Sequence, residues 1–235
     1  MPLPSIEIPS YELKLTTIEE KIPFRPFLVK EEKILLHAME GDQNDMVNAM
    51  KQIISNCLLV ELNVDELPLF DLEYLFLNLR SKSVGETAEL LLTCQECEAQ
   101  NPAEIDLGEV QIKFPPNEVS PNVMLTDEIG IVLKYPTVNM LKFFSFDDDF
   151  NFDTTLDIIE HCVDIIFEGE ELYDLNDYTK EERENFFQQM TQQQFGEIQN
   201  FFDNMPRLLH NVEFKCHACE SDQLIVLEGL QNFFG

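Results

Sequence analysis

The sequence has few basic residues, few glycines and no tryptophan. Its 235 residues include 15 Lys and Arg against 45 Asp and Glu, which gives a formal net charge of −30. A field of that sign repels phosphate backbones and anionic lipid headgroups, so we expect neither nucleic acid nor a membrane among its direct partners. Eight glycines leave little for phosphate-binding loops, and the common nucleotide-binding, zinc-protease and serine-hydrolase motifs do not occur. The sequence therefore predicts a protein that is not an enzyme.

Long apolar runs and targeting signals are missing as well. Residues 1–14 lack the charged and apolar regions of a signal peptide. No segment approaches the roughly 18–20 apolar residues that span a bilayer. We therefore expect a soluble protein made in a cytoplasm, where disulfides are rare and clustered cysteines more often bind metal. A hydrophobic content of 44% with 19 Phe residues excludes a disordered chain.

The spacing of apolar residues predicts an α+β fold in one compact domain. Residues 1–28 alternate apolar and polar positions and predict an N-terminal β arm or hairpin, which pairs either within its own core or with a partner's sheet edge. Residues 29–85 have helical spacing. Residues 86–114 and 207–229 predict strands of one split unit, and residues 115–206 predict an acidic, mostly helical insert within it.

Three features of the insert predict local structure. A short hairpin is expected around Asp127 and Glu128. Thr179 and Thr191 each begin a capping-box pattern at the start of a helix. A stripe at helical spacing predicts one buried helix, and its members are Leu156, Ile159, Val163 and Ile166.

Two CxxC pairs carry the clearest chemistry in the sequence. Cys94 and Cys97, and likewise Cys216 and Cys219, follow one predicted strand and precede another. Such a turn aims two thiolates at one point, and two turns supply the four sulfurs of a closed structural zinc site. The pairs are 118 residues apart, against about 15–20 in a continuous ribbon. The sequence thus predicts a split, four-cysteine, zinc-ribbon-like unit with a Zn²⁺ ion.

Other uses of the cysteines stay open. A redox pair needs a CxxC at the start of a helix, which neither pair has, and a disulfide needs an oxidising compartment. Iron in the same geometry and a pair without any ligand are further alternatives. Cys57 and Cys162 lie in apolar stripes and are predicted to be buried core residues. His217 lies within its CxxC turn and is expected to point outward.

Negative charge is concentrated in the insert. Between Phe143 and Pro206 there are 17 Asp and Glu residues against two bases, a local net charge of −15. Such a surface either keeps the protein in solution or docks against a basic partner. The candidate docking residues are Asp147, Asp148, Asp149, Glu170 and Glu171.

Four segments together resemble a phage family. They are Pro-Phe-Arg-Pro-Phe-Leu-Val-Lys-Glu-Glu-Lys at 23–33, the two CxxC pairs, and Leu-Glu-Gly-Leu-Gln-Asn-Phe-Phe at 227–234. They resemble the baseplate hub assembly proteins of T-even-like, contractile-tailed bacteriophages. The resemblance implies a non-enzymatic role in building the central hub, through contacts with other hub or tail assembly proteins. It implies action in the host cytoplasm during assembly, with retention in the virion tail baseplate left open.

Two other functions share parts of the pattern. An acidic zinc-ribbon regulator of transcription would have the same cysteines, but a ribbon that faces nucleic acid carries basic residues, whereas Glu96, Glu98 and Glu220 surround these turns. A DNA mimic that inhibits a nucleic-acid-binding enzyme would have the same charge. Baseplate assembly is the function that the residues and the resemblance together favour.

Overall fold

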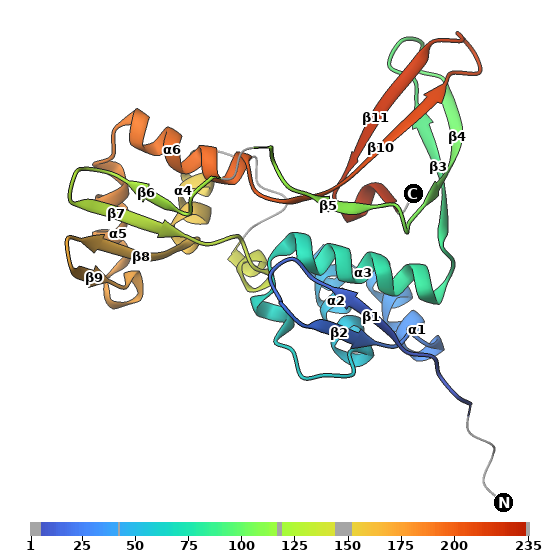
Figure 1. The fold of residues 1–235 in the computed structure, drawn as a ribbon, viewed down its shortest axis with the longest axis horizontal. Helices are drawn as coiled ribbons and strands as arrows, with labels where there is room; N and C mark the ends of the chain where they lie inside the picture. The colour runs from blue at the N-terminus through green and yellow to red at the C-terminus, as the bar shows by residue number, and fades with distance from the viewer. Residues whose placement is uncertain (1–5, 42, 117–118, 144–151, 234–235) are drawn as a thin grey trace, which may run out of the picture. The chain divides into compact units, whose positions relative to one another are not determined.

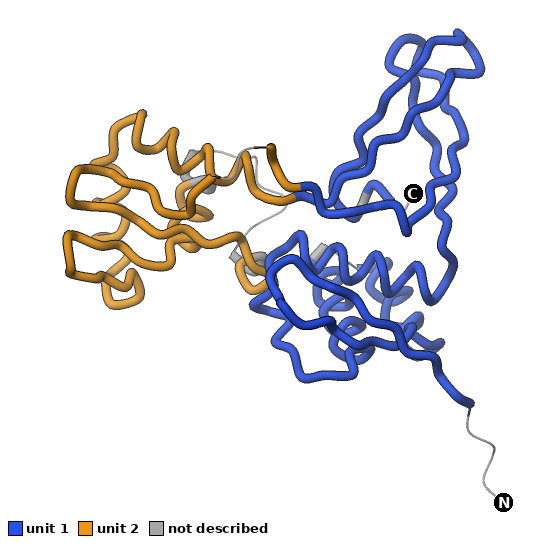
Figure 2. The backbone as a smooth tube through the Cα atoms, in the orientation of Figure 1, with its two compact units in different colours: residues 1–113, 207–235 blue, residues 114–206 orange. Residues whose placement is uncertain are grey.

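The computed structural model describes residues 6–41, 43–116, 119–143 and 152–233. Its contacts divide the chain into two compact units, where the sequence analysis expected one domain (Figure 2). Unit 1 comprises Met1–Lys113 with Arg207–Gly235, and unit 2 comprises Phe114–Pro206. Both units combine helices with small antiparallel sheets, so the α+β class is confirmed. No described helix has both the length and the apolar character that a membrane span requires.

Unit 1 begins with a hairpin followed by helices (Figure 1). Its first elements are β1 (Tyr11–Lys14), β2 (Lys21–Phe24), α1 (Val29–Ala38), α2 (Gln43–Cys57), the 3₁₀ turn η1 (Val64–Glu66) and α3 (Leu69–Ser83). β1 and β2 pair antiparallel, and Leu13, Ile22 and Phe24 bury their side chains. Alternation of apolar and polar residues therefore sets which face of the hairpin is buried.

Two buried carboxylates fix this hairpin and the helices that follow it. Asp71, in the first turn of α3, accepts hydrogen bonds from the backbone N–H groups of Thr16 at 2.9 Å and Thr17 at 3.0 Å. Glu31 in α1 forms an ion pair with Arg25 at 2.9 Å. Burial raises the pKa of Glu31, but the hydrogen bonds from Arg25 and from the Leu28 N–H, together with the positive charge of Arg25, outweigh it, so the pKa lies below its ordinary value. Glu31 is therefore a buried charge with its partner in place.

The rest of unit 1 consists of two hairpins, which we call the ribbon. Its strands are β3 (Thr87–Thr93), β4 (Gln100–Asp106), β5 (Gln111–Lys113), β10 (Arg207–Lys215) and β11 (Asp222–Glu228). β3 pairs with β4 in one sheet, and a second sheet has the order β11-β10-β5. Figure 1 shows that both hairpins run away from α3 and turn at a shared end. Each CxxC pair lies in one of these two turns.

The other end of the ribbon is packed on the helices of unit 1. α3 contacts β5 and β10, and the C-terminal 3₁₀ turn η4 (Leu230–Phe233) contacts α3 and β11. The backbone N–H of Leu230 donates to Glu73 in α3 at 3.2 Å, and Phe233 is fully buried. The ribbon therefore has an apolar base and a turn end that depends on other contacts.

Unit 2 is a four-stranded antiparallel sheet with helices. Its strands, in the sheet order, are β6 (Asn122–Met124), β7 (Ile129–Leu133), β8 (Val163–Glu168) and β9 (Glu171–Tyr173). Its helical elements are η2 (Val138–Phe143), α4 (Phe152–His161), η3 (Leu175–Asp177), α5 (Lys180–Gln188) and α6 (Gln192–Asp203). The predicted β6–β7 hairpin is confirmed. Both predicted capping boxes, at Thr179 and Thr191, are also present.

The prediction of one helix through Ile166 is wrong. α4 ends at His161, and β8 begins at Val163 and pairs with β7 on one side and β9 on the other. Val163, Ile165 and Ile166 are β-branched and favour a strand. A short apolar run can match both helical spacing and a buried strand. The insert therefore combines its helices with a four-stranded sheet, of which the sequence predicted only the β6–β7 hairpin.

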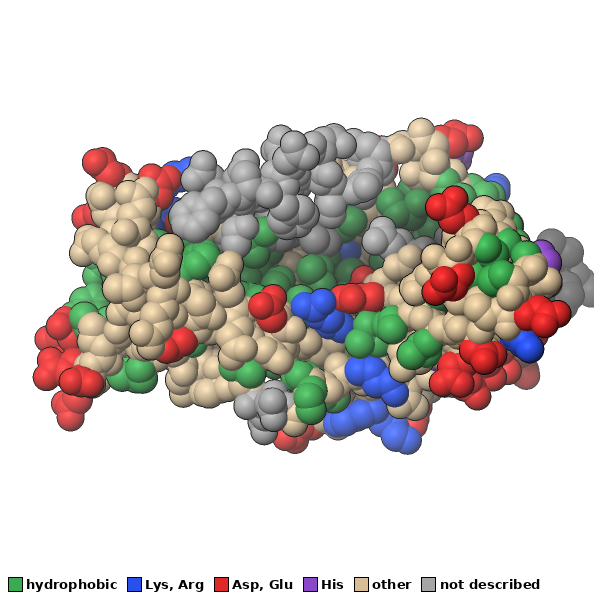
Figure 3. Space-filling view, turned by 90° about the horizontal axis from the view of Figure 1, so that it is seen from above, with side chains coloured by type: hydrophobic (Ala, Val, Ile, Leu, Met, Phe, Trp, Pro, Cys, Tyr) green, Lys and Arg blue, Asp and Glu red, His purple; other side chains and the backbone are tan. Residues whose placement is uncertain are grey.

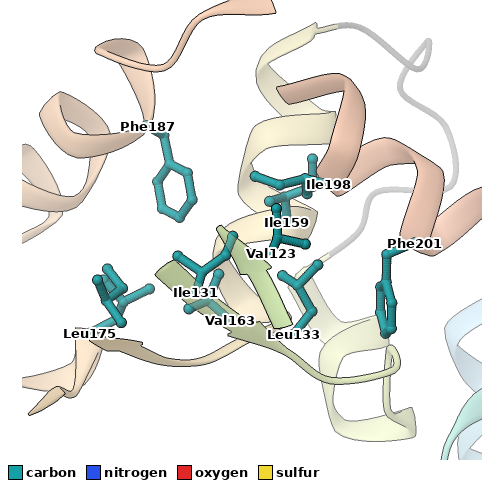
Figure 4. Close-up of a cluster of buried hydrophobic side chains, with 10 residues drawn as sticks. Val123, Ile131, Leu133, Ile159, Val163, Leu175, Phe187, Ile198 and Phe201 are labelled. Carbon is teal, nitrogen blue, oxygen red and sulfur yellow. The ribbon is translucent and has the colours of Figure 1, made fainter. Parts of the chain in front are cut away.

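The core of unit 2 joins the sheet to its helices. In Figure 4, Ile131 and Leu133 of β7 lie among side chains from α4, α5 and α6. The buried members of this cluster are Val123, Ile131, Leu133, Ile159, Val163, Ile166, Leu175, Phe187, Ile198 and Phe201. A Cβ atom at Gly130 would collide with the ring of Phe167 on the neighbouring strand, so a larger residue here would require that ring to move. Apolar contacts therefore form the core of this unit.

Candidate metal centre

The turn end of the ribbon brings the four predicted cysteines together. All four sulfur atoms lie within 4.8 Å of one another. Cys94 Sγ lies 3.7 Å from Cys219 Sγ, and Cys97 Sγ lies 3.6 Å from Cys216 Sγ. Zn–S bonds of about 2.3 Å give a tetrahedron with edges of about 3.8 Å, whereas a disulfide has an S–S distance of about 2.05 Å. The spacing fits four sulfurs around one metal ion.

The two CxxC turns have the same backbone structure. In each turn, the backbone N–H of the first cysteine donates to the carbonyl of the fifth residue after it at 2.9 Å. The carbonyl of the same cysteine accepts a hydrogen bond from the N–H of the fourth residue after it at 3.0 Å. Glu98 and Glu220, directly after the second cysteine, have φ angles of 61° and 58°. Residues other than glycine seldom adopt positive φ. Both turns are therefore built to the same specialised geometry.

Hydrogen bonds and neighbouring sulfurs act differently on the individual thiols. The N–H groups of Cys219 and Ala218 point at Cys216 Sγ and lower the pKa of Cys216 to about 6. The Ala99 N–H favours the thiolate of Cys97, but the sulfurs of Cys219 and Cys216 oppose it, and the pKa of Cys97 is raised to about 12. Four thiolates so close together repel one another, and a cation between them removes that repulsion.

Three polar side chains around the sulfurs were not identified from the sequence. Asn101 on β4 is buried and contacts the second turn at His217 and Cys216. Gln223 on β11 is buried and contacts the first turn at Gln95. Ser221 Oγ lies 3.0 Å from Cys219 Sγ. Asn101 and Gln223 each follow the second cysteine of their pair by four residues, which is the sequence signal that identifies them.

The remaining cysteines and His217 have other roles. Cys57 and Cys162 are fully buried, as predicted, and lie outside the quartet. Burial raises the pKa of Cys57 to about 11 and that of Cys162 to about 12, so both stay neutral thiols. His217 is exposed, as expected, and its Nδ1 lies 2.7 Å from Asn101 Oδ1. Its ring is therefore engaged with an amide beside the quartet.

The predicted docking residues lie in two parts of unit 2. Glu170 and Glu171 are exposed at the turn from β8 to β9. Asp147, Asp148 and Asp149 lie outside the described residues. Figure 3 shows carboxylate side chains gathered at the left edge of the face that it draws.

A hollow of about 390 Å³ is lined by residues of β7, β8, β9, η3 and α5. Its lining is Ile129, Ile166, Glu168, Tyr173, Leu175, Tyr178, Glu182, Arg183 and Phe186. Arg183 pairs with Glu160, and Lys180 lies 3.4 Å from Glu184, so both bases of this region are neutralised. The hollow thus has an apolar floor and a negative rim.

The comparisons with known proteins identify the family. A family model described as T4 bacteriophage base plate protein matches residues 8–235. The chain belongs to this family. The resemblance to phage baseplate proteins is therefore confirmed, and this baseplate protein has a structural or assembly role in the baseplate of a T4-like bacteriophage. No curated protein and no solved structure gives a significant match.

Proposed function

We propose that the protein is a non-enzymatic factor that assembles, or forms part of, the central hub of the phage tail baseplate. Its family membership over residues 8–235 carries this proposal. It would act through contacts with other hub or tail assembly proteins, first in the host cytoplasm and then in the virion tail baseplate. The acidic hollow of unit 2 and the cysteine quartet of the ribbon supply a docking surface and a stabilising ion for that role.

A phage carrying a nonsense mutation in this chain tests the assembly role. Infected cells should accumulate tail precursors without complete baseplates, and the wild-type chain supplied from a plasmid should restore them. The tagged chain should co-purify with hub proteins. Normal baseplates in the mutant would contradict the proposal. Loss of late transcription with capture of a polymerase would instead favour the regulator, and capture of a nuclease would favour the DNA mimic.

We further propose that Cys94, Cys97, Cys216 and Cys219 hold one structural Zn²⁺ ion, which makes the two hairpins a split zinc ribbon. Four sulfurs within 4.8 Å of one another, two pairs of them 3.7 and 3.6 Å apart, can complete a tetrahedral set, which leaves no position for a substrate or water. Elemental analysis of untagged protein, purified without chelator, should give one zinc per chain. A metal content near zero contradicts the site, whereas iron at one per chain contradicts only the identity of the ion.

The acidic surface of unit 2 is proposed to dock a basic segment of a hub protein. The hollow is lined mainly by apolar side chains together with Glu168 and Glu182, and Glu170 and Glu171 follow Glu168 closely in the sequence, which suits an apolar side chain flanked by Lys or Arg. Complementary charge mainly increases the association rate and is screened over about 8 Å at physiological salt. Association should therefore slow as salt rises, with less change in the dissociation rate.

Charge substitutions test this docking surface. The set Asp147→Asn, Asp148→Asn, Asp149→Asn, Glu170→Gln and Glu171→Gln should slow capture of the hub partner without unfolding the protein. Glu89→Gln with Glu213→Gln is a control that removes exposed charge from the ribbon. A further variant, Glu170→Gln with Glu171→Gln alone, matches that control in number of charges. Equal association rates for all variants would leave solubility as the role of these acids.

A further inference from the structure

Each CxxC turn is part of a longer sequence motif that occurs twice in the chain. Residues 94–101 read Cys-Gln-Glu-Cys-Glu-Ala-Gln-Asn, and residues 216–223 read Cys-His-Ala-Cys-Glu-Ser-Asp-Gln. Both contain the pattern Cys-x-x-Cys-Glu-x-x followed by a side-chain amide. The shared part includes the glutamate at positive φ and ends on Asn101 in one copy and Gln223 in the other.

Each amide contacts the turn of the opposite copy. Asn101 Oδ1 accepts a hydrogen bond from the backbone N–H of His217, the residue after Cys216, at 2.9 Å. Gln223 Oε1 accepts one from the backbone N–H of Gln95, the residue after Cys94, at 3.0 Å. The two contacts are equivalent in position, so they relate the hairpins by an approximate twofold symmetry.

The amides also contact the environment of the sulfurs. Asn101 Nδ2 donates to the carbonyl of Ala99 at 2.9 Å and lies 3.7 Å from Cys216 Sγ. Gln223 Nε2 donates to Ser221 Oγ at 2.9 Å, and that hydroxyl lies between Cys94 Sγ and Cys219 Sγ at 3.7 and 3.0 Å. A buried amide can fill donor and acceptor positions together. Each amide therefore links the backbone of the opposite CxxC turn to sulfurs of the site, Asn101 directly and Gln223 through the Ser221 hydroxyl.

No strand ladder joins the two hairpins within the described part of the chain. β3 and β4 form a sheet separate from β11, β10 and β5. At the turn end, the described polar contacts between the hairpins are those of the four sulfurs and of Asn101, Gln223 and Ser221. The relative position of the two cysteine pairs is therefore set there by side chains rather than by backbone pairing.

We infer that Asn101 and Gln223 are reciprocal positioning residues, which hold the two CxxC turns in register around one metal ion. They also place hydrogen-bond donors next to its sulfur ligands. This inference rests on the proposed metal site. Groups that orient metal ligands from behind typically change metal affinity 10–100-fold when they are removed. Asn101 acts on Cys216 directly, whereas Gln223 acts on Cys94 and Cys219 through Ser221.

Four substitutions separate these contributions. Asn101→Ala and Gln223→Ala remove a whole amide. Asn101→Asp and Gln223→Glu keep the acceptor oxygen but remove the N–H donor, and Asn101→Asp places a negative charge beside the thiolates. Gln100→Ala is the matched control, because Gln100 is an exposed amide on the same strand as Asn101.

The full-length variants are loaded with Co²⁺ or Zn²⁺ and compared. Both alanine variants should transfer Zn²⁺ to a chelator about 10–100-fold faster than wild type, and Gln100→Ala should transfer it at the wild-type rate. Asn101→Asp should be faster than Gln223→Glu and should shift the Co²⁺–thiolate absorption band, because Asn101 directly faces a ligand sulfur. Hydrogen exchange in α3 and in unit 2 checks that the variants remain folded.

The outcomes distinguish this inference from the proposed site. If wild type takes up neither ion, the proposed metal site fails and the inference fails with it. If wild type binds one ion and all four variants release it at the wild-type rate, the site stands and the positioning role is overturned. Faster release with an unchanged Co²⁺ band in Asn101→Asp would overturn the direct action on sulfur.

Discussion

The sheet of unit 2 and the turn end of the ribbon are held together in different ways. The sheet buries ten apolar residues from strands and helices in one cluster. The turn end buries Cys94, Cys216, Asn101 and Gln223, which are polar or able to ionise. Apolar burial stabilises a fold by itself, whereas buried polar groups stabilise it only when each has a partner.

The difference indicates how each region can be disrupted. Core truncations should unfold unit 2 and leave the ribbon metal in place. Loss of the metal should loosen the ribbon and leave unit 2 intact. The two effects should be separate, because the ribbon and the sheet belong to different compact units.

Loss of a metal ligand should have the largest effect. Structural zinc contributes roughly 10–16 kcal/mol of apparent binding free energy in small fingers, and its share is smaller in a larger unit. Cys216→Ser should abolish stoichiometric metal binding and remove hydrogen-exchange protection from the turn ends of β3, β4, β10 and β11. Protection in unit 2 should not change.

Cys162→Ala is the matched control for that ligand substitution. It also removes a buried thiol, but one in unit 2, so it should keep the metal and lower stability by about 1 kcal/mol. Metal content and exchange are measured on both variants. Retention of the metal in Cys216→Ser would contradict the quartet as its site.

A side-chain truncation in the sheet should have the opposite effect, because it should destabilise unit 2 and leave the metal in place. Ile131 is fully buried in the centre of unit 2. Ile131→Ala should lower the stability of unit 2 by about 2–5 kcal/mol, because it removes apolar contacts and leaves a cavity. Denaturant unfolding should show this loss while the metal content stays at the wild-type value. Leu172→Ala, at a position 70% exposed, is the control and should change stability by less than about 0.5 kcal/mol.

Helix capping in unit 2 should have a smaller effect. Thr179 accepts a hydrogen bond from the N–H of Glu182, and the Glu182 carboxylate accepts one from the N–H of Thr179 at 2.8 Å. Thr179→Ala should cost about 1 kcal/mol by leaving the N–H of Glu182, at the start of α5, without its cap. Thr179→Ser keeps the hydroxyl and should recover most of that loss in urea unfolding. Equal stability of the alanine and serine variants would show that the hydroxyl cap does not stabilise α5.

Removal of residues 1–10 should have the smallest effect on the isolated protein. Ile6 is 88% exposed and Ile8 is 43% exposed, and both precede the first residue of β1. The truncated chain should keep its melting temperature and its metal. If residues 1–10 add a strand to a hub protein, the truncated chain should no longer capture that hub protein. A truncation that unfolds unit 1 would place the arm in its own core.

The sequence predicted the short-range features of this fold well. Strands on both sides of each CxxC pair, the β6–β7 hairpin and the caps at Thr179 and Thr191 depend on neighbouring residues and occur as expected. It failed at Val163–Glu168, where the same apolar residues suit a helix face and a strand between two others. Only pairing with Ile131 and its neighbours decides between these two structures.

The sequence by itself determined which cysteines form pairs, where the negative charge is concentrated and, through its family match, that this is a baseplate protein. The tertiary structure decided that the pairs meet, although 118 residues separate them, and that Asn101 and Gln223 lie between their turns. Spacing along the chain fixes the geometry within one turn. Contacts between distant hairpins depend on how their apolar base packs on α3, which local patterns do not specify.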